Sequence, residues 1–149
     1  MRQSAPPLKT GDLVGVVAAS SAYDDLQPLA AGLELLRSWG LQANNQSIPV
    51  RRWGYLAGTD QERIADLQHQ PSPALLACAR GGWGAARLLE HPIQWNPGWL
   101  LGFSDVTALL LARQSAGLDG GIHGPLLNTL AAEPVWSQER LRALLFGEP

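Results

Sequence analysis

Ser104 is the side chain of this sequence best suited to act as a nucleophile. It follows an apolar run at residues 99–102, which predicts a strand, and precedes a second apolar run at residues 106–112, which predicts a helix. A serine at a strand-to-helix turn can project its hydroxyl beyond the end of a sheet, and Gly102 allows that turn to be tight. The backbone N–H groups that follow lie at a helix N-terminus, where negative charge is favoured. This combination suits attack on a carbonyl group, which creates an oxyanion.

The same residues also have a simpler structural interpretation. Serine is a common N-cap residue, so Ser104 could serve only to begin the helix. The G-x-S-x-G signature of a hydrolase nucleophile turn is not met, because Val106 stands where the second glycine would be. Asp105 could offer its N–H to an oxyanion, but a carboxylate in the first turn of a helix is also stabilised by the helix dipole alone. Both interpretations stay open at this point.

A glycine-rich segment at residues 81–84 could supply further hydrogen-bond donors. It follows an apolar run at residues 74–79, and three glycines in four positions allow the backbone to approach a ligand closely. The N–H groups of Gly81 and Gly82 are therefore candidate oxyanion donors beside that of Asp105. A tight turn without a ligand explains the same glycines equally well.

No general base for Ser104 is evident in the sequence. His69 and His91 each end a predicted helix, where a solvated surface position is expected. His123 ends a short predicted strand and could reach the site, although a structural hydrogen-bonding role fits as well. The histidines and the single Cys78 show no HExxH or CxxC spacing, so we expect no metal site.

The composition is that of one compact globular domain. The chain has 149 residues, of which 46% are hydrophobic and 16% charged, and its formal net charge is −2. It has no run of like charges, so neither nucleic acid nor a membrane surface is expected as a partner. The N-terminus lacks the apolar stretch of a signal peptide, and a single cysteine agrees with a reducing compartment. We therefore expect a cytoplasmic protein.

Short apolar runs alternate with amphipathic helical patterns along the chain. Buried strands are predicted at residues 13–19 and 74–79, and an apolar strand at 99–102. Residues 121–125 predict a short strand that ends in a turn, and a further short strand is predicted at 41–43. Helices are predicted at residues 24–40 with Asp24 as the cap, at 59–70 with a Thr59–Glu62 capping box, at 85–91, at 106–117, and from Ser137 with Leu141, Leu144 and Leu145 buried. We expect the helix at 106–117, apolar nearly all round, to be deeply packed.

This alternation predicts an α/β fold, doubly wound, with a mostly parallel sheet flanked by helices. Ligands in such sheets bind outside the carboxyl ends of the strands. Three segments are expected there, at residues 20–21, 80–84 and 102–105. Trp53 and Tyr55 lie in a glycine-punctuated loop, where they could line a groove or only cover the domain edge.

Four motifs occur in a characteristic order. They are GYLAGTD at residues 54–60 with Arg63 after it, RGGWG at 80–84 with RLL at 87–89, GFSDVTAL at 102–109, and HGP at 123–125. Their order and spacing closely resemble the LD-carboxypeptidase family of serine peptidases, from about Gly11 to the end of the chain. Trp83 stands where the family usually has tyrosine, which preserves an aromatic face.

The resemblance implies a muramoyltetrapeptide carboxypeptidase, which removes the terminal D-alanine from murein tetrapeptide in peptidoglycan recycling. Such enzymes use a Ser-His-Glu triad and neither a metal nor a cofactor. The resemblance assigns the nucleophile to Ser104, the oxyanion hole to the N–H groups of Asp105, Gly81 and Gly82, and substrate contacts to Trp83, Tyr55 and Arg80.

The resemblance also bears on domain organisation and partners. The family's Glu and His come from a C-terminal domain, so we expect residues 1–149 to be a single flavodoxin-like, nucleophile-bearing N-terminal domain without that partner. Such a domain should be inactive alone, and we expect a homodimer. Two alternatives remain: an immunity-type member of the family that cleaves a peptide-nucleotide antibiotic, and a non-catalytic flavodoxin-like module that holds an anionic ligand.

Overall fold

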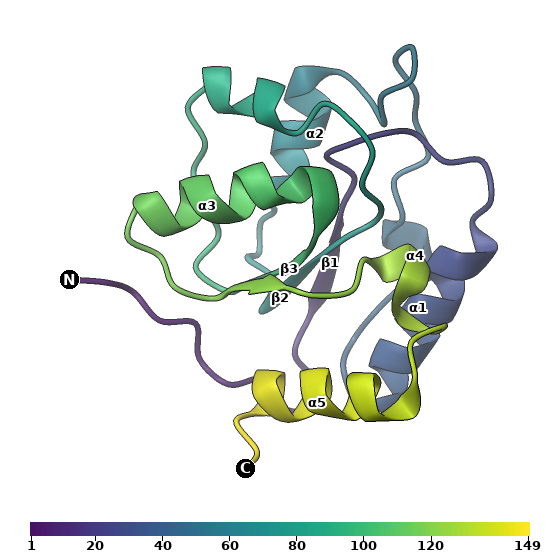
Figure 1. Ribbon diagram of the computed structural model, residues 1–149, viewed down its shortest axis with the longest axis vertical. Coiled ribbons are helices and arrows are strands. Elements are labelled where there is room, and N and C mark those ends of the chain that lie inside the picture. The colour runs from purple at the N-terminus through teal and green to yellow at the C-terminus, as the bar shows by residue number, and fades with distance from the viewer.

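A parallel β-sheet forms the centre of the computed structural model, which describes residues 1–149 (Figure 1). The four strands are β1 (Val14–Val17), β2 (Leu75–Cys78), β3 (Trp99–Gly102) and β4 (Gly121–His123), and they lie in that order with every pair parallel. The strand predicted at residues 41–43 is reduced to one bridge, between Leu13 and Gln42, on the side of β1 away from β2. With that bridge counted, the strand order is the flavodoxin-like order that the sequence predicts.

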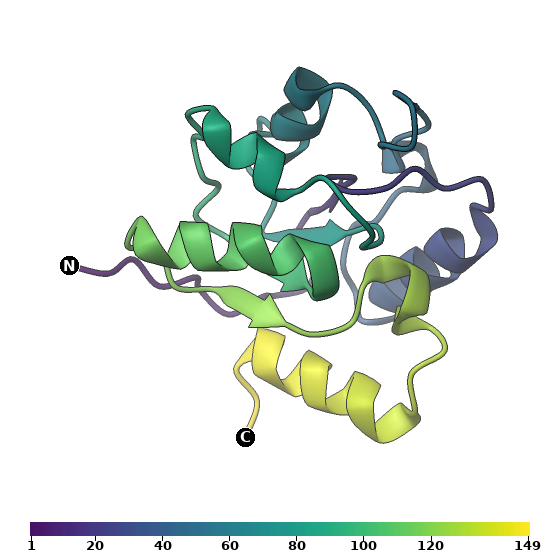
Figure 2. The same ribbon diagram turned by 45° about the horizontal axis from the view of Figure 1, so that its top comes forward.

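Helices cover both faces of the sheet (Figure 2). One face carries α1 (Gln27–Ser38), α4 (Leu127–Leu130) and α5 (Val135–Phe146). The other face carries α2 (Asp60–Leu67), the 3₁₀ helix η2 (Ala86–Glu90) and α3 (Thr107–Ser115). Two short 3₁₀ helices, η1 (Asn45–Ser47) and η3 (Ser104–Val106), complete the set. No helix combines the length and the apolar character needed to cross a membrane.

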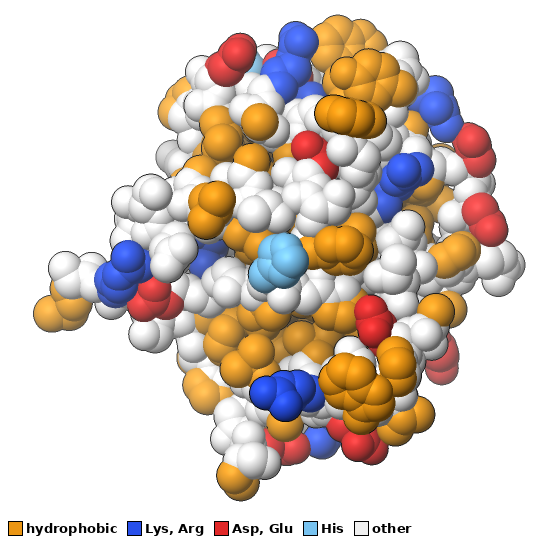
Figure 3. All heavy atoms as spheres, in the orientation of Figure 1, with side chains coloured by type: hydrophobic (Ala, Val, Ile, Leu, Met, Phe, Trp, Pro, Cys, Tyr) orange, Lys and Arg blue, Asp and Glu red, His pale blue; other side chains and the backbone are white.

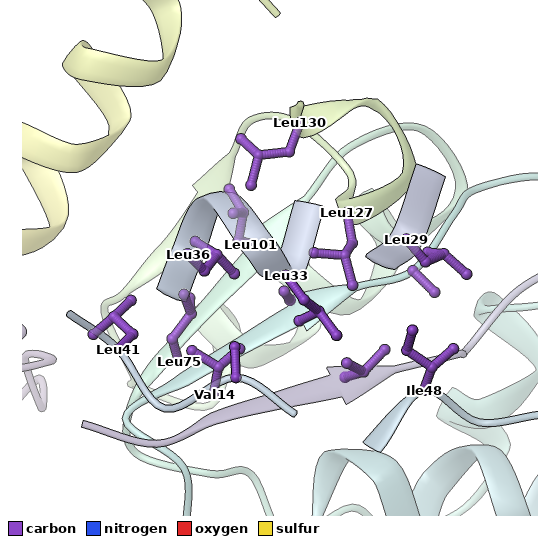
Figure 4. Close-up of a cluster of buried hydrophobic side chains, with 14 of the residues drawn as sticks. Val14, Leu29, Leu33, Leu36, Leu41, Ile48, Leu75, Leu101, Leu127 and Leu130 are labelled. Carbon is purple, nitrogen blue, oxygen red and sulfur yellow. The ribbon is translucent and has the colours of Figure 1, made fainter. Parts of the chain in front are cut away.

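The sequences of β1, β2 and β3 are continuous apolar runs because helices bury both faces of the sheet there, whereas β4 buries only Ile122. Val14 and Val16 belong to the core on the α1 side, and Val17 belongs to the core on the α3 side, as the two-residue period of a strand requires. Figure 4 shows the first core, in which leucines of α1 and α4 pack over the sheet. Gly32 permits this contact, because a Cβ there would lie 2.3 Å from the backbone oxygen of Leu127.

The helix ends confirm one predicted cap and correct another. The capping box is present at α2, where Thr59 and Glu62 exchange both hydrogen bonds. The predicted cap of α1 by Asp24 is wrong: Asp24 pairs with Arg52 at 2.6 Å, and the N–H of Gln27 donates to Asp25 at 3.0 Å instead. The helix begins later than expected because a proline occupies its first turn, which is where proline is tolerated in a helix.

Two predicted burial patterns are also corrected. Helix α5 begins at Val135, and Leu141 and Leu145 are buried while Leu144 is 53% exposed. Residues 141 and 145 are four apart and share the buried face, whereas residue 144 is rotated by about 100° from its neighbour Leu145. Likewise α3 is not packed all round, since Leu111 is 59% exposed. Apolar side chains therefore remain on the outer faces of both helices.

Candidate active site

The three segments predicted to meet at the carboxyl ends of the strands do meet. Ser20, just beyond β1, donates from Oγ to a carboxylate oxygen of Asp105 at 2.6 Å. The N–H of Ser21 donates to the backbone oxygen of Gly81 at 3.3 Å. Neighbouring parallel strands end at the same edge of a sheet, which brings together residues up to 85 positions apart in the sequence.

Ser104 has an unusual backbone conformation at this edge. It is the one non-glycine residue with a positive φ, at 63°. The left-handed region costs an L-residue roughly 1–2 kcal/mol, so surrounding contacts must impose it. The serine does not act as a helix cap: Phe103 occupies the N-cap position of η3, and no side-chain capping hydrogen bond is present there. The Ser104 hydroxyl instead lies beside Gly81 of the neighbouring segment.

The strain predicts an unusual order of stabilities. Because glycine adopts a positive φ without penalty, we expect the variant Ser104→Gly to be about 1 kcal/mol more stable than Ser104→Ala. At Ser137, in the right-handed first turn of α5, the order should reverse, because glycine disfavours a helix. Denaturant unfolding of the four variants measures both differences. A Ser104 pair that follows the order of the Ser137 pair would contradict a strained turn.

Gly81 lies directly against Ser104. A Cβ at Gly81 would be 3.0 Å from both Cβ and Oγ of Ser104 and 3.7 Å from the backbone nitrogen of Asp105. The N–H groups of Gly81 and Gly82 have no acceptor within the chain. A hydroxyl beside unpaired backbone donors is an arrangement that can attack a carbonyl and stabilise the resulting oxyanion.

Side chains on the neighbouring segments hold the glycine-rich segment in place. Ser21 Oγ accepts from the N–H of Trp83 at 3.1 Å, and a Cβ at Gly82, whose φ is 110°, would lie 2.1 Å from that oxygen. One carboxylate oxygen of Asp105 accepts from both Ser20 Oγ and the N–H of Ala85, the latter at 2.9 Å. These roles of Ser20, Ser21 and the Asp105 side chain were not predicted. The only sequence signal for them was the position of two serines just after a strand.

The predicted substrate-contacting side chains lie on the rim of this edge. Trp83 is 73% exposed and Tyr55 is 63% exposed. The backbone oxygen of Tyr55 accepts from the N–H of Ala22, which fixes the aromatic loop beside the end of β1. Arg80 donates to the backbone oxygens of Ala22, at 3.1 Å, and Gly81, at 3.2 Å, and it lines a pocket of about 330 Å³ between α1 and α4.

The histidines and the cysteine do not complete a nucleophilic pair with Ser104. His123 is exposed at the end of β4 and contacts the ring of Phe103 edge-on, with centroids 6.1 Å apart. His91 Nε2 lies 3.2 Å from Asp60, and no histidine is hydrogen-bonded to Ser104. Burial, followed by the nearby charge of Asp66, raises the pKa of the Cys78 thiol to about 12, so this cysteine stays protonated and unreactive.

Comparison with known proteins identifies the family of this chain. Residues 14–124 match the LD-carboxypeptidase N-terminal domain. A relative from Synechocystis is 45% identical in an alignment 150 positions long that covers 96% of this chain and 49% of the relative. The murein tetrapeptide carboxypeptidase of Pseudomonas aeruginosa is 33% identical in an alignment 147 positions long that covers 90% of this chain and 47% of that protein.

A solved structure shows the same fold. The microcin C7 self immunity protein MccF, in its inactive mutant apo state, superposes with a TM-score of 0.78 at 24% identity, covering 95% of this chain and 46% of that one. The chain thus spans about half the length of the relatives it matches. Ser104 and the glycine-rich segment both fall within the matched residues. This chain belongs to the LD-carboxypeptidase family, whose N-terminal domain it contains.

Proposed function

We propose that this chain carries the nucleophile of a serine carboxypeptidase that removes the terminal D-alanine from murein tetrapeptide, a reaction of peptidoglycan recycling in the cytoplasm. The observation that carries the proposal is Ser104, held at a φ of 63° with Gly81 against its hydroxyl. Membership of the family supports the reaction class. The Pseudomonas aeruginosa relative, which is named murein tetrapeptide carboxypeptidase, supports the substrate.

The proposed chemistry is acyl transfer to serine. Ser104 Oγ attacks the carbonyl carbon of the last peptide bond, and the carbonyl oxygen becomes an oxyanion that accepts from the N–H groups of Asp105 and of Gly81 or Gly82. The hydroxyl proton passes to a general base and then to the leaving amine of D-alanine. Water hydrolyses the acyl-enzyme and restores the serine. Trp83, Tyr55 and Arg80 are proposed to contact the rest of the peptide.

The proposed base lies outside these 149 residues. Ser104 Oγ has no hydrogen bond to a histidine or carboxylate of this chain, whereas a serine hydroxyl needs a neighbouring base to react at neutral pH. We propose that a Glu and a His from a C-terminal domain complete the triad, as the resemblance of the sequence implies. General-base help is worth about 10²- to 10⁴-fold in rate.

A D-alanine release assay tests both parts of the proposal. The 149-residue chain joined to the proposed C-terminal domain, called the full-length protein below, should release D-alanine from murein tetrapeptide, and the 149-residue chain alone should release almost none. Turnover by the 149-residue chain that depends on Ser104 would show that its base is within this chain, with His123 as the first residue to substitute. Failure of the full-length protein to act on murein tetrapeptide would contradict the substrate.

An immunity-type activity is the second candidate, because the fold is shared with the microcin C7 self immunity protein. The same assay can offer a peptide-nucleotide conjugate as a competing substrate. Preference for the conjugate over murein tetrapeptide, measured as the ratio of kcat/KM values, would favour this candidate. Both candidates use the same serine, so the substrate alone separates them.

We also propose that the exposed apolar side chains of α5 belong to an interface between two copies of this chain. Val135, Trp136 and Leu144 are 67%, 69% and 53% exposed, and Figure 3 shows hydrophobic side chains gathered between β4 and α5. Exposed apolar surface of this kind favours association between two copies of the chain. The 149-residue chain should therefore self-associate in sedimentation, and Trp136→Ser should weaken the association. A strictly monomeric chain at high concentration would contradict the interface.

A further inference from the structure

We propose that Arg63 is a positioning residue, whose buried guanidinium holds the glycine-rich segment at residues 81–84 in place beside Ser104. The inference rests on the proposed function, because it assigns Arg63 a part in that same site. Arg63 belongs to α2, which lies behind the site and carries none of the side chains assigned to the reaction.

The guanidinium of Arg63 links the segments that follow two neighbouring strands, β1 and β2. The side chain is fully buried, with 0% of its surface exposed. Its Nη1 donates both to the backbone oxygen of Ala19, next to the serines that follow β1, at 2.8 Å, and to that of Gly84, at 2.9 Å. A Cβ at Gly84 would lie 3.0 Å from this nitrogen, so the segment packs closely against it. One nitrogen atom therefore sets the position of the segment relative to the end of β1.

Asp60 holds the guanidinium in turn. Its carboxylate accepts from Arg63 Nη2 at 2.9 Å, from Arg87 Nε at 2.9 Å, and contacts His91 Nε2 at 3.2 Å. Burial by itself raises the pKa of Asp60, but the hydrogen bonds from Arg87, His91 and Arg63 together lower that pKa below its ordinary value. The carboxylate therefore stays ionised at neutral pH and balances the buried charge of Arg63.

The contacts of residues 83–85 show why this position matters. Arg63 donates to the backbone oxygen of Gly84. The Asp105 carboxylate accepts from the N–H of Ala85, the next residue. Ser21 Oγ accepts from the N–H of Trp83. The free N–H groups of the segment come just before these three fixed positions. Loss of the Arg63 contact should let the segment move, and a shift of about 1 Å in a catalytic donor can lower a rate about 10²-fold.

Arg63→Lys and Asp60→Asn in the full-length protein test this inference. A lysine ammonium cannot span both backbone oxygens and Asp60 as the planar guanidinium does. We expect kcat for D-alanine release to fall about 10²-fold with KM nearly unchanged, because the contact serves the transition state rather than ground-state binding. The amide protons of Trp83 and Ala85 should exchange with solvent faster, while those within β2 stay protected. Asp60→Asn keeps the shape of the carboxylate. It should also lower kcat and speed the exchange of these two amide protons, but by a smaller amount.

Arg113→Lys is the matched control. Arg113 is also buried, at 2% exposure. It donates instead to the backbone oxygens of Asn96 and Gly98, which precede β3 at the amino-terminal ends of the strands, away from the site. This variant should lower thermal stability without changing kcat or the exchange of Trp83 and Ala85. If Arg63→Lys behaves in the same way, the positioning role is wrong and Arg63 is only structural.

The exchange measurement separates this inference from the proposed function. If Ser104→Ala leaves turnover intact, the proposed function fails, whereas the exchange of Trp83 and Ala85 still reports whether Arg63 holds the segment. If Ser104→Ala abolishes turnover while neither Arg63→Lys nor Asp60→Asn changes kcat and exchange, the inference alone is overturned. Where Arg63→Lys does not fold, Asp60→Asn decides the outcome by the same two readouts.

Discussion

Ser104→Ala in the full-length protein is expected to lower kcat for D-alanine release from murein tetrapeptide by at least about 10⁴-fold, because without the hydroxyl no acyl-enzyme can form. The fold should survive the change, since Ser104 Oγ has no hydrogen-bond partner within the chain and the N-cap position belongs to Phe103. Circular dichroism and the temperature of unfolding check that point. Loss of activity with the fold retained would identify the hydroxyl as the reacting group.

Ser115→Ala is the control for this experiment. Ser115 is exposed at the last position of α3, the helix that follows Ser104, so its loss should change neither kcat nor stability. Turnover that survives Ser104→Ala would contradict the enzymatic proposal and favour the alternative of a non-catalytic binding module. Such a module would be indifferent to the hydroxyl, and ligand binding rather than turnover would then be the property to measure.

Gly81→Ala is expected to lower kcat by about 10²- to 10³-fold while leaving the fold intact. The new methyl group would stand 3.0 Å from Cβ and Oγ of Ser104, where the substrate carbonyl must approach. It would also displace the free N–H groups of Gly81 and Gly82, and removal of one oxyanion donor costs about 10²- to 10³-fold in kcat. Steady-state kinetics with a thermal unfolding scan would measure both effects.

Two other glycines provide the controls for Gly81→Ala. At Gly121, on β4, a Cβ would meet Leu110 at an ordinary 3.4 Å, so Gly121→Ala should have little effect on activity. At Gly82, a Cβ would lie 2.1 Å from Ser21 Oγ at a φ of 110°, so Gly82→Ala should reduce stability as well as kcat. If Gly81→Ala leaves kcat unchanged, the glycine-rich segment is only a tight turn.

Local patterns in the sequence predicted most of the architecture. Continuous apolar runs located β1, β2 and β3, because strands covered on both faces exclude polar side chains. The fourth strand, β4, was predicted only as a short strand ending in a turn, and Ile122 is its one buried residue. The Thr59–Glu62 capping box was predicted because its two hydrogen bonds join residues three apart. The helical pattern was less decisive for burial, since Leu111 and Leu144 are as apolar as their buried neighbours and yet lie on outer faces.

The candidate site was predicted only in part. Parallel strands placed Ser104 beside the glycine-rich segment, as expected, because their carboxyl ends share one edge of the sheet. The choice between a helix cap and a strained turn could not be made from the residues. The φ of 63° at Ser104 is imposed by contacts between segments rather than by local preference, which for serine favours the right-handed region.

By itself the sequence determined the alternation of strands and helices, the two-sided burial of the sheet, and which chain segments end at its functional edge. Tertiary structure alone decided which polar groups pair across that edge. Ser20 reaches Asp105 over 85 positions, and Arg63 reaches Gly84 over 21. Hydrophobic periodicity does not predict such hydrogen-bond partners, because the pairing depends on strand order and on how closely the backbones approach. The hydrogen bonds that support the site, from Arg63, Ser20 and Ser21, therefore form only in the folded chain.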